Sequence, residues 1–211
     1  MTYTVREIFY TLQGEGAHTG RPAVFCRFAG CNLWTGREQD RATAICDFCD
    51  TDFVGIGPDG GRFGTPYELA DAVAAAWPAG AGGGQPYVVC TGGEPLLQLD
   101  QAAIAALQAR GFQVAVESNG TRPAPRTLDW VCISPKARAP LVQISGDELK
   151  LVYPQKGAPP ERFASLDFTH FSLPPMDGPS LEANTRAAVA YCLTHPRWQL
   201  SLQTHKLLGL R

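Results

Sequence analysis

Residues 30–51 read GCNLWTGREQDRATAICDFCDT and carry three cysteines, Cys31, Cys46 and Cys49, with a long gap followed by a short one. Three thiolates can hold three irons of a 4Fe–4S cluster and leave the fourth iron open for an exogenous ligand. Phe48 lies between the two close cysteines, where an aromatic ring would shield one side of a cluster from water. The segment therefore predicts an iron–sulfur loop.

A second segment supports this interpretation. Residues 88–95 read VVCTGGEP, an apolar strand that runs into a Gly-Gly-Glu turn. Such a turn can bring backbone carbonyls and a carboxylate to an ammonium group. Together the two segments resemble the radical S-adenosylmethionine (SAM) superfamily. The resemblance implies that the open iron binds the amino and carboxylate groups of SAM, and that reduction then releases a 5′-deoxyadenosyl radical.

A structural zinc site is the alternative for the three cysteines. Zinc prefers four Cys or His ligands, and a Cys-x2-Cys pair is its usual knuckle. The fourth ligand would come from another cysteine or from one of the four histidines. The Gly-Gly-Glu strand end favours the cluster over zinc. The other cysteines lie in apolar segments and are expected in the core, where free cysteine behaves as a small hydrophobe: they are Cys26, Cys90, Cys132 and Cys192.

Composition favours one domain in a reducing compartment. The chain has 211 residues, which is enough for a substantial core. Its cysteines number seven, an odd count, and no segment has the order of a signal peptide. No apolar run approaches the roughly 20 residues of a membrane helix. We therefore expect one cytoplasmic domain over residues 1–211 that does not associate with membranes.

Charge argues against nucleic acid as a partner. Eighteen basic residues face twenty acidic ones, and no Lys/Arg cluster stands out. Binding to a phosphate backbone requires such a positive excess. A small molecule is therefore the expected ligand.

Helical segments are few. Thr65 is a capping residue that Pro66 follows at the first helical position, and Glu68 lies three residues after the cap. Two more helices are expected over 99–110 and 181–193, whereas the compositions of 55–64 and 78–86 indicate loops.

Strands are expected in greater number, over residues 4–10, 23–28, 87–90, 114–116, 130–134, 149–152, 168–173 and 199–202. Alternation of strands and helices predicts an α/β fold with mostly parallel strands and right-handed crossovers. Three helices are too few for a complete eight-fold barrel. We therefore predict an abridged, partly open radical SAM (β/α) barrel.

Nearly every predicted strand ends in a polar or charged group. In parallel α/β sheets the ligand site lies outside the carboxyl ends of the strands. One such residue alone would more often be a solvated loop residue, but their recurrence predicts one shared polar pocket. In chain order the groups are 13–16, Arg27, the cysteine loop, 92–94, 117–120, 134–136, Lys150 and 203–206.

Motifs at both ends of the chain make the resemblance more specific. Residues 11–16 read TLQGEG, 25–33 read FCRFAGCNL, 49–51 read CDT and 203–206 read QTHK. Together they are similar to the 7-carboxy-7-deazaguanine synthase family, over most of the chain. The resemblance implies conversion of 6-carboxy-5,6,7,8-tetrahydropterin, with expulsion of ammonia, to a precursor of queuosine and other 7-deazapurines. It also implies a 4Fe–4S cluster, SAM, Mg²⁺ and a homodimer.

The same resemblance distributes roles among the residues of the pocket. It implies that Cys31, Cys46 and Cys49 hold the cluster and that Thr51 binds Mg²⁺. It implies substrate contacts from Leu12, Gln13, Gly14, Glu15, Arg27, Gly92, Lys136 and His205, the last two as catalytic candidates. SAM contacts are implied for Phe48, Gly93, Glu94, Glu117, Ser118, Asn119 and Ser134.

Two of these roles also follow from side-chain chemistry. Arg27 suits the substrate carboxylate because a guanidinium pairs with it through two hydrogen bonds. Glu15 suits the guanidine-like edge of the pterin, which offers hydrogen-bond donors. His205 could bind the substrate, carry a proton, or do both.

One departure from the superfamily lies inside the cysteine loop. The common spacing is Cys-x3-Cys-x2-Cys, whereas this chain reads Cys-x14-Cys-x2-Cys. Residues from about 32 to 45 are therefore an insertion, and their charges indicate a solvent-facing segment that replaces a missing helix or docks an electron donor such as flavodoxin. Loops tolerate insertions at small entropic cost, so the cluster ligands are expected to stay in place.

A glycyl-radical-enzyme activase is the main alternative within the superfamily. Such activases are short and use the same cluster, but they act on a protein backbone. They would not need Gln13, Glu15, Arg27 and His205 to converge on a small polar ligand. A non-catalytic zinc-binding domain is the alternative from another class.

Overall fold

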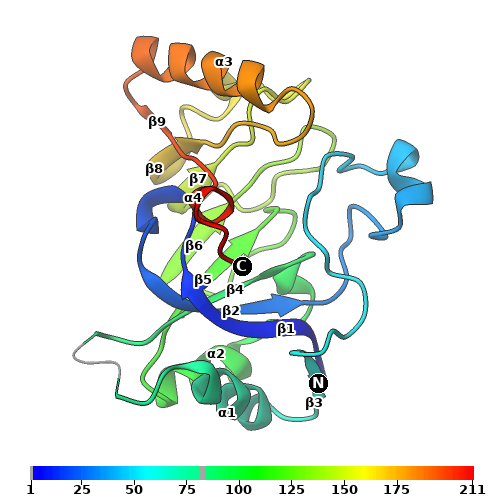
Figure 1. Ribbon diagram of the computed structural model, residues 1–211, viewed down its shortest axis with the longest axis vertical. Helices are drawn as coiled ribbons and strands as arrows, with labels where there is room; N and C mark the ends of the chain where they lie inside the picture. Colours follow the sequence, from blue (N-terminus) through cyan, green and yellow to red (C-terminus); the bar gives the residue numbers. More distant parts are fainter. Residues whose placement is uncertain (1, 81–83) are drawn as a thin grey trace.

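The computed structural model describes residues 2–80 and 84–211, and one curved sheet of nine strands organises that part of the chain (Figure 1). The strand order is β3-β1-β2-β4-β5-β6-β7-β8-β9. The strands are β1 (Tyr3–Leu12), β2 (Pro22–Phe28), β3 (Gly61–Phe63), β4 (Tyr87–Gly92), β5 (Gln113–Ser118), β6 (Trp130–Ile133), β7 (Ser145–Lys150), β8 (Asp167–Leu173) and β9 (Trp198–Leu200).

Strand direction changes at one end of the sheet. From β2 to β9 every neighbouring pair is parallel, whereas β1 runs antiparallel to both β2 and β3. Leu12, the last residue of β1, therefore lies opposite Pro22, the first residue of β2. The chain leaves β1 at the amino edge of the parallel strands, so the polar residues after it do not start from the carboxyl edge as the sequence predicted.

The segment after β1 instead crosses the interior of the curved sheet to its far side. Gly16 N donates to Ser201 Oγ at 2.8 Å, and Ala17 N donates to Glu148 Oε2 at 3.2 Å. Ser201 directly follows β9, and Glu148 lies in β7. The crossing segment thus partly closes the barrel, although the two edge strands of the described sheet, β3 and β9, do not pair with each other.

The two faces of the sheet differ because side chains alternate along each strand. The outer face is apolar: Cys26, Val88, Val116 and their neighbours pack under two helices in the larger core. The inner face carries an apolar layer around Tyr87 and Ala115, with polar side chains above it. The polar layer becomes the functional site.

Four α-helices lie along the described chain: α1 (Pro66–Ala76), α2 (Gln101–Ala109), α3 (Leu181–Thr194) and α4 (Thr204–Leu208). Thr65 caps α1 by accepting from Glu68 N, with Pro66 at the first position, as predicted. Asp100 caps α2 and also accepts from the Tyr3 hydroxyl at 2.8 Å, which ties α2 to β1. Helices α1 and α2 cover one end of the sheet and α3 the other (Figure 1).

The structure differs from the sequence prediction in several short elements. Strand β3 lies inside the stretch expected to be loop, β7 begins four residues before the expected strand, and α4 was not predicted. Short 3-10 helices also form over 16–18, 38–43, 95–97 and 160–162. The expected loop over 78–86 includes residues 81–83, which lie outside the described residues. None of the described helices has the length and apolarity needed to span a membrane.

Within the inserted part of the cysteine loop, residues Glu38–Thr43 form a 3-10 helix whose side chains are largely exposed. Its ends are anchored: Trp34 and Ala44 are buried, and Trp34 packs edge-on against Phe53. Arg41 lies over the Trp34 ring and donates to the carbonyl oxygen of Cys49 at 3.0 Å. The segment therefore projects from the fold but contacts the backbone beside a predicted cluster ligand.

Candidate functional site

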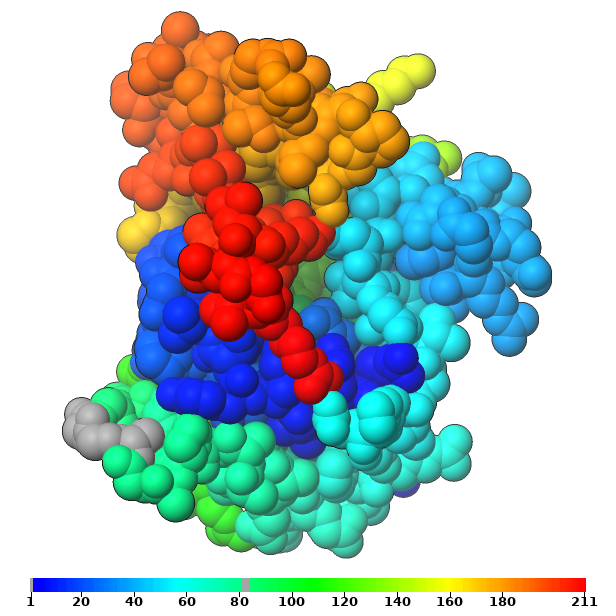
Figure 2. Space-filling view, in the orientation of Figure 1, coloured from blue at the N-terminus to red at the C-terminus, as the bar shows by residue number. Residues whose placement is uncertain are grey.

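A pocket of about 350 Å³ opens on the inner face of the sheet. Figure 2 shows the C-terminal segment lying across the N-terminal strand, between α3 and the cysteine loop. The lining residues come from β1 and the segment after it, from β2, β4, β5 and β7, from the segments after β6 and β8, from the cysteine loop and from the C-terminal segment. Segments distant in the sequence thus share one site.

The floor of the pocket is a buried polar network. Lys150 Nζ lies 3.0 Å from Glu15 Oε2 and 3.2 Å from Glu117 Oε1. Gln13 Nε2 donates to Glu117 Oε1 at 2.9 Å, and Gln13 Oε1 accepts from Glu15 N at 3.1 Å. The crossing segment therefore places its Gln and Glu against the ends of β5 and β7.

Charge pairing decides the protonation of this floor. Burial alone would raise the pKa of Glu15, but the Lys150 ammonium and a hydrogen bond from Gln203 together hold that pKa below its usual value. Burial alone would lower the pKa of Lys150, but Glu117 and Glu15 hold it well above its usual value. Glu15 and Lys150 are thus both charged at neutral pH.

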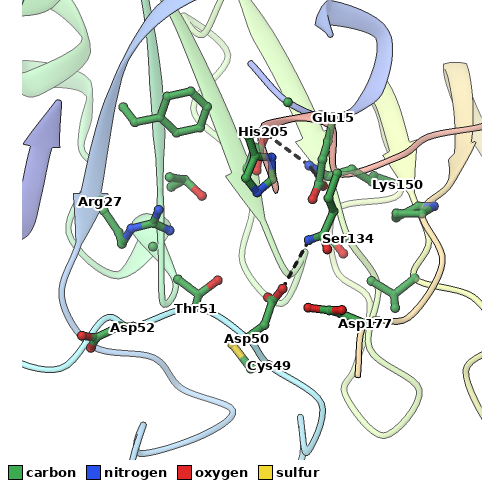
Figure 3. A pocket seen from close by; sticks show the side chains of 18 of the residues that line it. Glu15, Arg27, Cys49, Asp50, Thr51, Asp52, Ser134, Lys150, Asp177 and His205 are labelled. Atoms are coloured by element: carbon green, nitrogen blue, oxygen red, sulfur yellow. Dashed lines mark hydrogen bonds and ion pairs between the residues drawn. The ribbon is translucent and has the colours of Figure 1, made fainter. Parts of the chain in front are cut away.

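One wall carries a second ion-pair cluster. Arg27 Nε donates to Glu7 Oε1 at 2.8 Å, and Arg211 donates to Glu7 Oε2 at 2.8 Å. Both guanidinium groups lie near the ring of Phe9, at 6.0 and 4.8 Å from its centroid. In Figure 3 Arg27 and Lys150 approach the pocket from opposite sides, with His205 between them. The cavity thus has a cationic group on each side.

The C-terminal segment reaches the pocket because Gly14 has no side chain. A Cβ atom there would lie 2.1 Å from His205 Nδ1. Thr204 N and Thr204 Oγ1 both donate to the Gly14 carbonyl oxygen, at 3.0 and 2.9 Å. The close approach holds the His205 ring over the floor.

The three loop cysteines lie together beside the pocket. The Cys46 thiol donates a hydrogen bond to Cys49, which lowers the pKa of Cys49 and raises that of Cys46. Cys31 accepts from Leu33 N at 3.4 Å, and it packs with Cys49 in two small apolar clusters. Among residues 2–80 and 84–211 no three His, Cys, Asp or Glu side chains already form a metal-binding group.

The Gly-Gly-Glu turn packs directly against the cysteine loop. Glu94 N donates to the Gly30 carbonyl oxygen at 3.0 Å, and a Cβ atom on Gly93 would lie 2.1 Å from that oxygen. Gly93 must therefore be glycine for the turn to reach the loop. Gly92 and Gly93 present their backbone to the pocket.

Glu94 itself is fully buried. Its carboxylate accepts from Ser118 Oγ at 2.9 Å, from Asn119 N at 2.8 Å and from Leu96 N at 3.0 Å. Burial raises its pKa above the usual value despite these donors. The side chain is thus engaged with the end of β5, outside the lining of the pocket, and its predicted contact with SAM stays a prediction.

Lys136 and Ser134 line the wall opposite the crossing segment. Lys136 Nζ donates to Ser134 Oγ at 2.7 Å and to its carbonyl oxygen at 3.0 Å. The same ammonium lies 5.7 Å from the ring centroid of Phe48, within reach of the cation–π attraction. The pair thus faces the predicted cluster site.

Lys206 forms a clasp at the rim of the pocket. Its Nζ lies 2.7 Å from Asp50 Oδ2 and 2.6 Å from Asp177 Oδ2, and Gln203 Nε2 donates to Asp50 at 3.2 Å. Burial opposes ionisation of Asp50, but Lys206 holds the pKa of that carboxyl below its usual value. The clasp joins α4 to the cysteine loop and to the loop before α3.

Most residues singled out from the sequence share this pocket. Two lie directly behind its lining, Cys31 and Glu94. Of the cysteines expected in the core, Cys26 and Cys90 lie under α1 and α2, Cys132 lies in the polar barrel interior, and Cys192 is half-buried on α3. Seven charged lining residues had no predicted role: Glu7, Asp50, Asp52, Lys150, Asp177, Lys206 and Arg211.

Comparison with known proteins gives relatives that match over the full length. A 7-carboxy-7-deazaguanine synthase from Caulobacter vibrioides is 67% identical over 211 residues, covering 100% of both chains. The protein of that name from Bordetella pertussis is 63% identical with the same coverage. No family model matches the chain.

A solved structure supports the architecture. The crystal structure of QueE from Escherichia coli superimposes with a TM-score of 0.71 over 96% of this chain and 94% of that chain, at 24% sequence identity. At this identity the likeness concerns the fold, and it confirms the predicted abridged, partly open α/β barrel.

The clasp gives a first prediction, for the dynamics of α4. Replacing Lys206 by Met removes two half-exposed ion pairs, which together contribute about 1 kcal/mol. We expect amide hydrogen exchange over residues 204–208 to accelerate about fivefold at low salt, and the effect to shrink at high salt because salt screens these charges. Lys156→Met, at an exposed site, is the control. Unchanged exchange in Lys206→Met would show that the clasp does not hold α4.

Proposed function

The chain belongs to the 7-carboxy-7-deazaguanine synthase family, and on that premise we propose that it is a radical SAM enzyme that converts 6-carboxy-5,6,7,8-tetrahydropterin to 7-carboxy-7-deazaguanine with loss of ammonia. The product would serve the biosynthesis of queuosine and other 7-deazapurines. The observation that carries the proposal is the shared pocket, where the cysteine loop, the Gly-Gly backbone and paired polar groups face one cavity of small-molecule size.

The cysteine loop fits a 4Fe–4S cluster with three protein ligands. Its thiols lie together in apolar surroundings. Burial raises the pKa of Cys31, but Cys31 and Cys49 both accept hydrogen bonds from backbone N–H groups, and these bonds favour the thiolate that a cluster requires. Cys31, Cys46 and Cys49 would hold the cluster, with Phe48 and Lys136 beside it. When bound and reduced, the cluster supplies the electron that cleaves SAM.

SAM would lie along the carboxyl ends of β4, β5 and β6. The Gly92–Gly93 backbone is available to the methionyl group, and Glu117, Asn119 and Ser134 line the same side of the cavity. Glu94 and Ser118 hold this edge together through their mutual hydrogen bond. We infer that Glu94 acts mainly by fixing the turn, whose backbone contacts the ligand.

The pterin would lie between Arg27, the floor and His205. Arg27 would pair with the substrate carboxylate, sharing its charge with Glu7. The ionised Glu15 accepts from the guanidine-like edge of the pterin, beside the Leu12–Gly14 backbone. His205 and Lys136 line the cavity and would move a proton to the departing ammonia.

Thr51 would provide a ligand for Mg²⁺. The ion requires oxygen ligands and keeps several waters. Asp50 and Asp52 on either side line the same cavity but are paired with Lys206 and Arg6, whereas no ion pair in the described part of the chain engages the Thr51 hydroxyl. Substrate oxygens would complete the shell.

We propose a homodimer and a flavodoxin-type electron donor as partners, in the cytoplasm. Leu207 and Leu208 on α4 are 74% and 65% exposed, which supports a covering copy of the chain. The 3-10 helix of the insertion, whose Arg41 contacts the Cys49 backbone, supports docking of the donor there. Free cysteines throughout support a reducing compartment. A sedimentation experiment that finds only monomer would contradict the homodimer. Reduction of the cluster by flavodoxin that is equally fast after deletion of residues 36–44 would contradict docking of the donor at the insertion.

The second prediction tests the cluster together with the reaction. Purified without oxygen, the protein should be brown, absorb near 400 nm and turn over the tetrahydropterin. Cys46→Ala should abolish SAM cleavage because the cluster loses one of only three protein ligands. Cys192→Ala, at a half-buried site on α3, should leave iron content and turnover unchanged. A colourless protein that binds zinc would contradict the proposal, and modification of a partner polypeptide instead of the pterin would favour an activase.

The third prediction concerns Mg²⁺. Turnover of chelator-treated enzyme should rise on addition of Mg²⁺, and Thr51→Ala should weaken that response without loss of iron. Thr51→Ser keeps the hydroxyl and is the matched control. Turnover that is indifferent to Mg²⁺ in the presence of chelator would exclude a magnesium ion from the reaction.

The fourth prediction separates substrate binding from radical generation. Arg27→Ala should weaken pterin binding on the order of a hundredfold, because it leaves a partly buried substrate carboxylate without its guanidinium partner. Arg27→Lys, which keeps the charge but not the paired hydrogen bonds, should give an intermediate loss. Both variants should keep their iron and still cleave SAM slowly when reduced without substrate. Normal pterin turnover by Arg27→Ala would overturn the assignment.

A further inference from the structure

Lys150 is the buried charge at the centre of the pocket floor. It ends β7, its residue is 6% exposed, and it lines the cavity. Its ammonium lies 3.0 Å from Glu15 Oε2 and 3.2 Å from Glu117 Oε1 (Figure 3 shows Glu15 and Lys150 together). The roles proposed above do not include it.

The contacts of Lys150 close a ring with residues of both halves of the site. Glu15 N bonds to Gln13, Gln13 bonds to Glu117, and Lys150 bridges Glu117 back to Glu15. Glu15 and Gln13 face the proposed pterin position, whereas Glu117 faces the proposed SAM position. Lys150 is therefore in direct contact with one carboxylate of each half.

Stability alone does not explain a lysine here. The attraction within a buried ion pair is largely offset by the free-energy cost of desolvating its two charges. Apolar residues of the same volume therefore often stabilise a fold equally well. Besides Glu15 and Glu117, the groups that face the ammonium are Glu148 on β7 and Cys132 on β6. Without the ammonium the floor would hold three carboxylates, and Glu15 would lose the charge that opposes the effect of burial, so the pKa of Glu15 would rise.

We propose that Lys150 is a positioning residue that holds the Glu15 and Glu117 side chains in fixed register through its two ion pairs, so that the pterin and SAM are aligned with each other. The inference rests on the proposed function. It predicts that variants without the ammonium still cleave SAM, but that fewer of the radicals they form react with the pterin.

The test compares reconstituted wild type, Lys150→Met, Lys150→Gln and Lys150→Arg. Two quantities are measured: 5′-deoxyadenosine released per deazaguanine formed, and the KM for the pterin from pH 6.5 to 8.5. The ratio should rise at least about fivefold in the Met and Gln variants. Their KM should fall by about fivefold or more as pH rises, because a carboxylate that has gained a proton must lose it before it can accept from the pterin.

Lys150→Arg keeps the positive charge and should retain the flat pH profile of the wild type. Lys156→Met, at an exposed site after β7, should match the wild type in both measurements. Iron content and thermal melting identify any variant that fails to fold. The Gln variant then carries the test in place of Met, because its amide can still donate to a carboxylate.

The outcomes separate this inference from the proposed function. If the wild type itself leaves the pterin unchanged, the proposed function fails. If the wild type turns over and a folded Met or Gln variant keeps both the wild-type ratio and a flat pH profile, Lys150 is only structural and the inference is overturned. A raised ratio with a new pH dependence, restored by Arg, supports it.

Discussion

The direction of the first strand is the constraint on which the site depends. Because β1 runs against β2, its chain emerges at the amino edge of the parallel strands and can reach the far side only through the barrel interior. The crossing places residues 13–17 beneath the cavity, where the backbone of Gly16 and Ala17 bonds to Ser201 and Glu148 and the side chains of Gln13 and Glu15 meet β5 and β7. The polar floor, the partial closure and the seat for the C-terminal segment all follow from this path.

A barrel interior crossed by backbone and filled with charge must balance that charge locally, because unpaired ions are costly in a low dielectric. Three of the cations at the cavity have carboxylate partners: Arg27 has Glu7, Lys150 has Glu15 and Glu117, and Lys206 has Asp50 and Asp177. A substrate carboxylate or a guanidine-like edge therefore joins ion pairs that already exist. The site is organised before the ligand arrives, which reduces the reorganisation that binding requires.

Local chemistry in the sequence was sufficient to predict much of the fold and of the site. Short apolar-rich segments, the Thr65 cap and the Gly-Gly-Glu strand end identified the main strands, α1 and the pocket edge. The reversal of β1 could not be predicted, because the residues of antiparallel and parallel strands in this sheet do not differ locally. The ion-pair partners of Lys150 and Lys206 could not be predicted either, because they lie more than 25 residues away in the chain. The crossing segment and the clasp bring them together only in the folded protein. The three-residue β3 and the short α4 carry too little periodicity to be detected.

Glycine positions explain why these distant segments can meet at all. Gly14 leaves the space that the His205 ring occupies, and Gly93 allows the strand-end turn to touch the cysteine loop at Gly30. A methyl group at either position would force apart two segments whose hydrogen bonds, Thr204 to Gly14 and Glu94 to Gly30, hold the cavity closed on two sides. The motifs at the two ends of the chain and the one in its middle are therefore parts of a single steric arrangement. Each glycine is required by a residue that is close to it in the fold. The short motifs therefore reflect contacts that form only in the folded site.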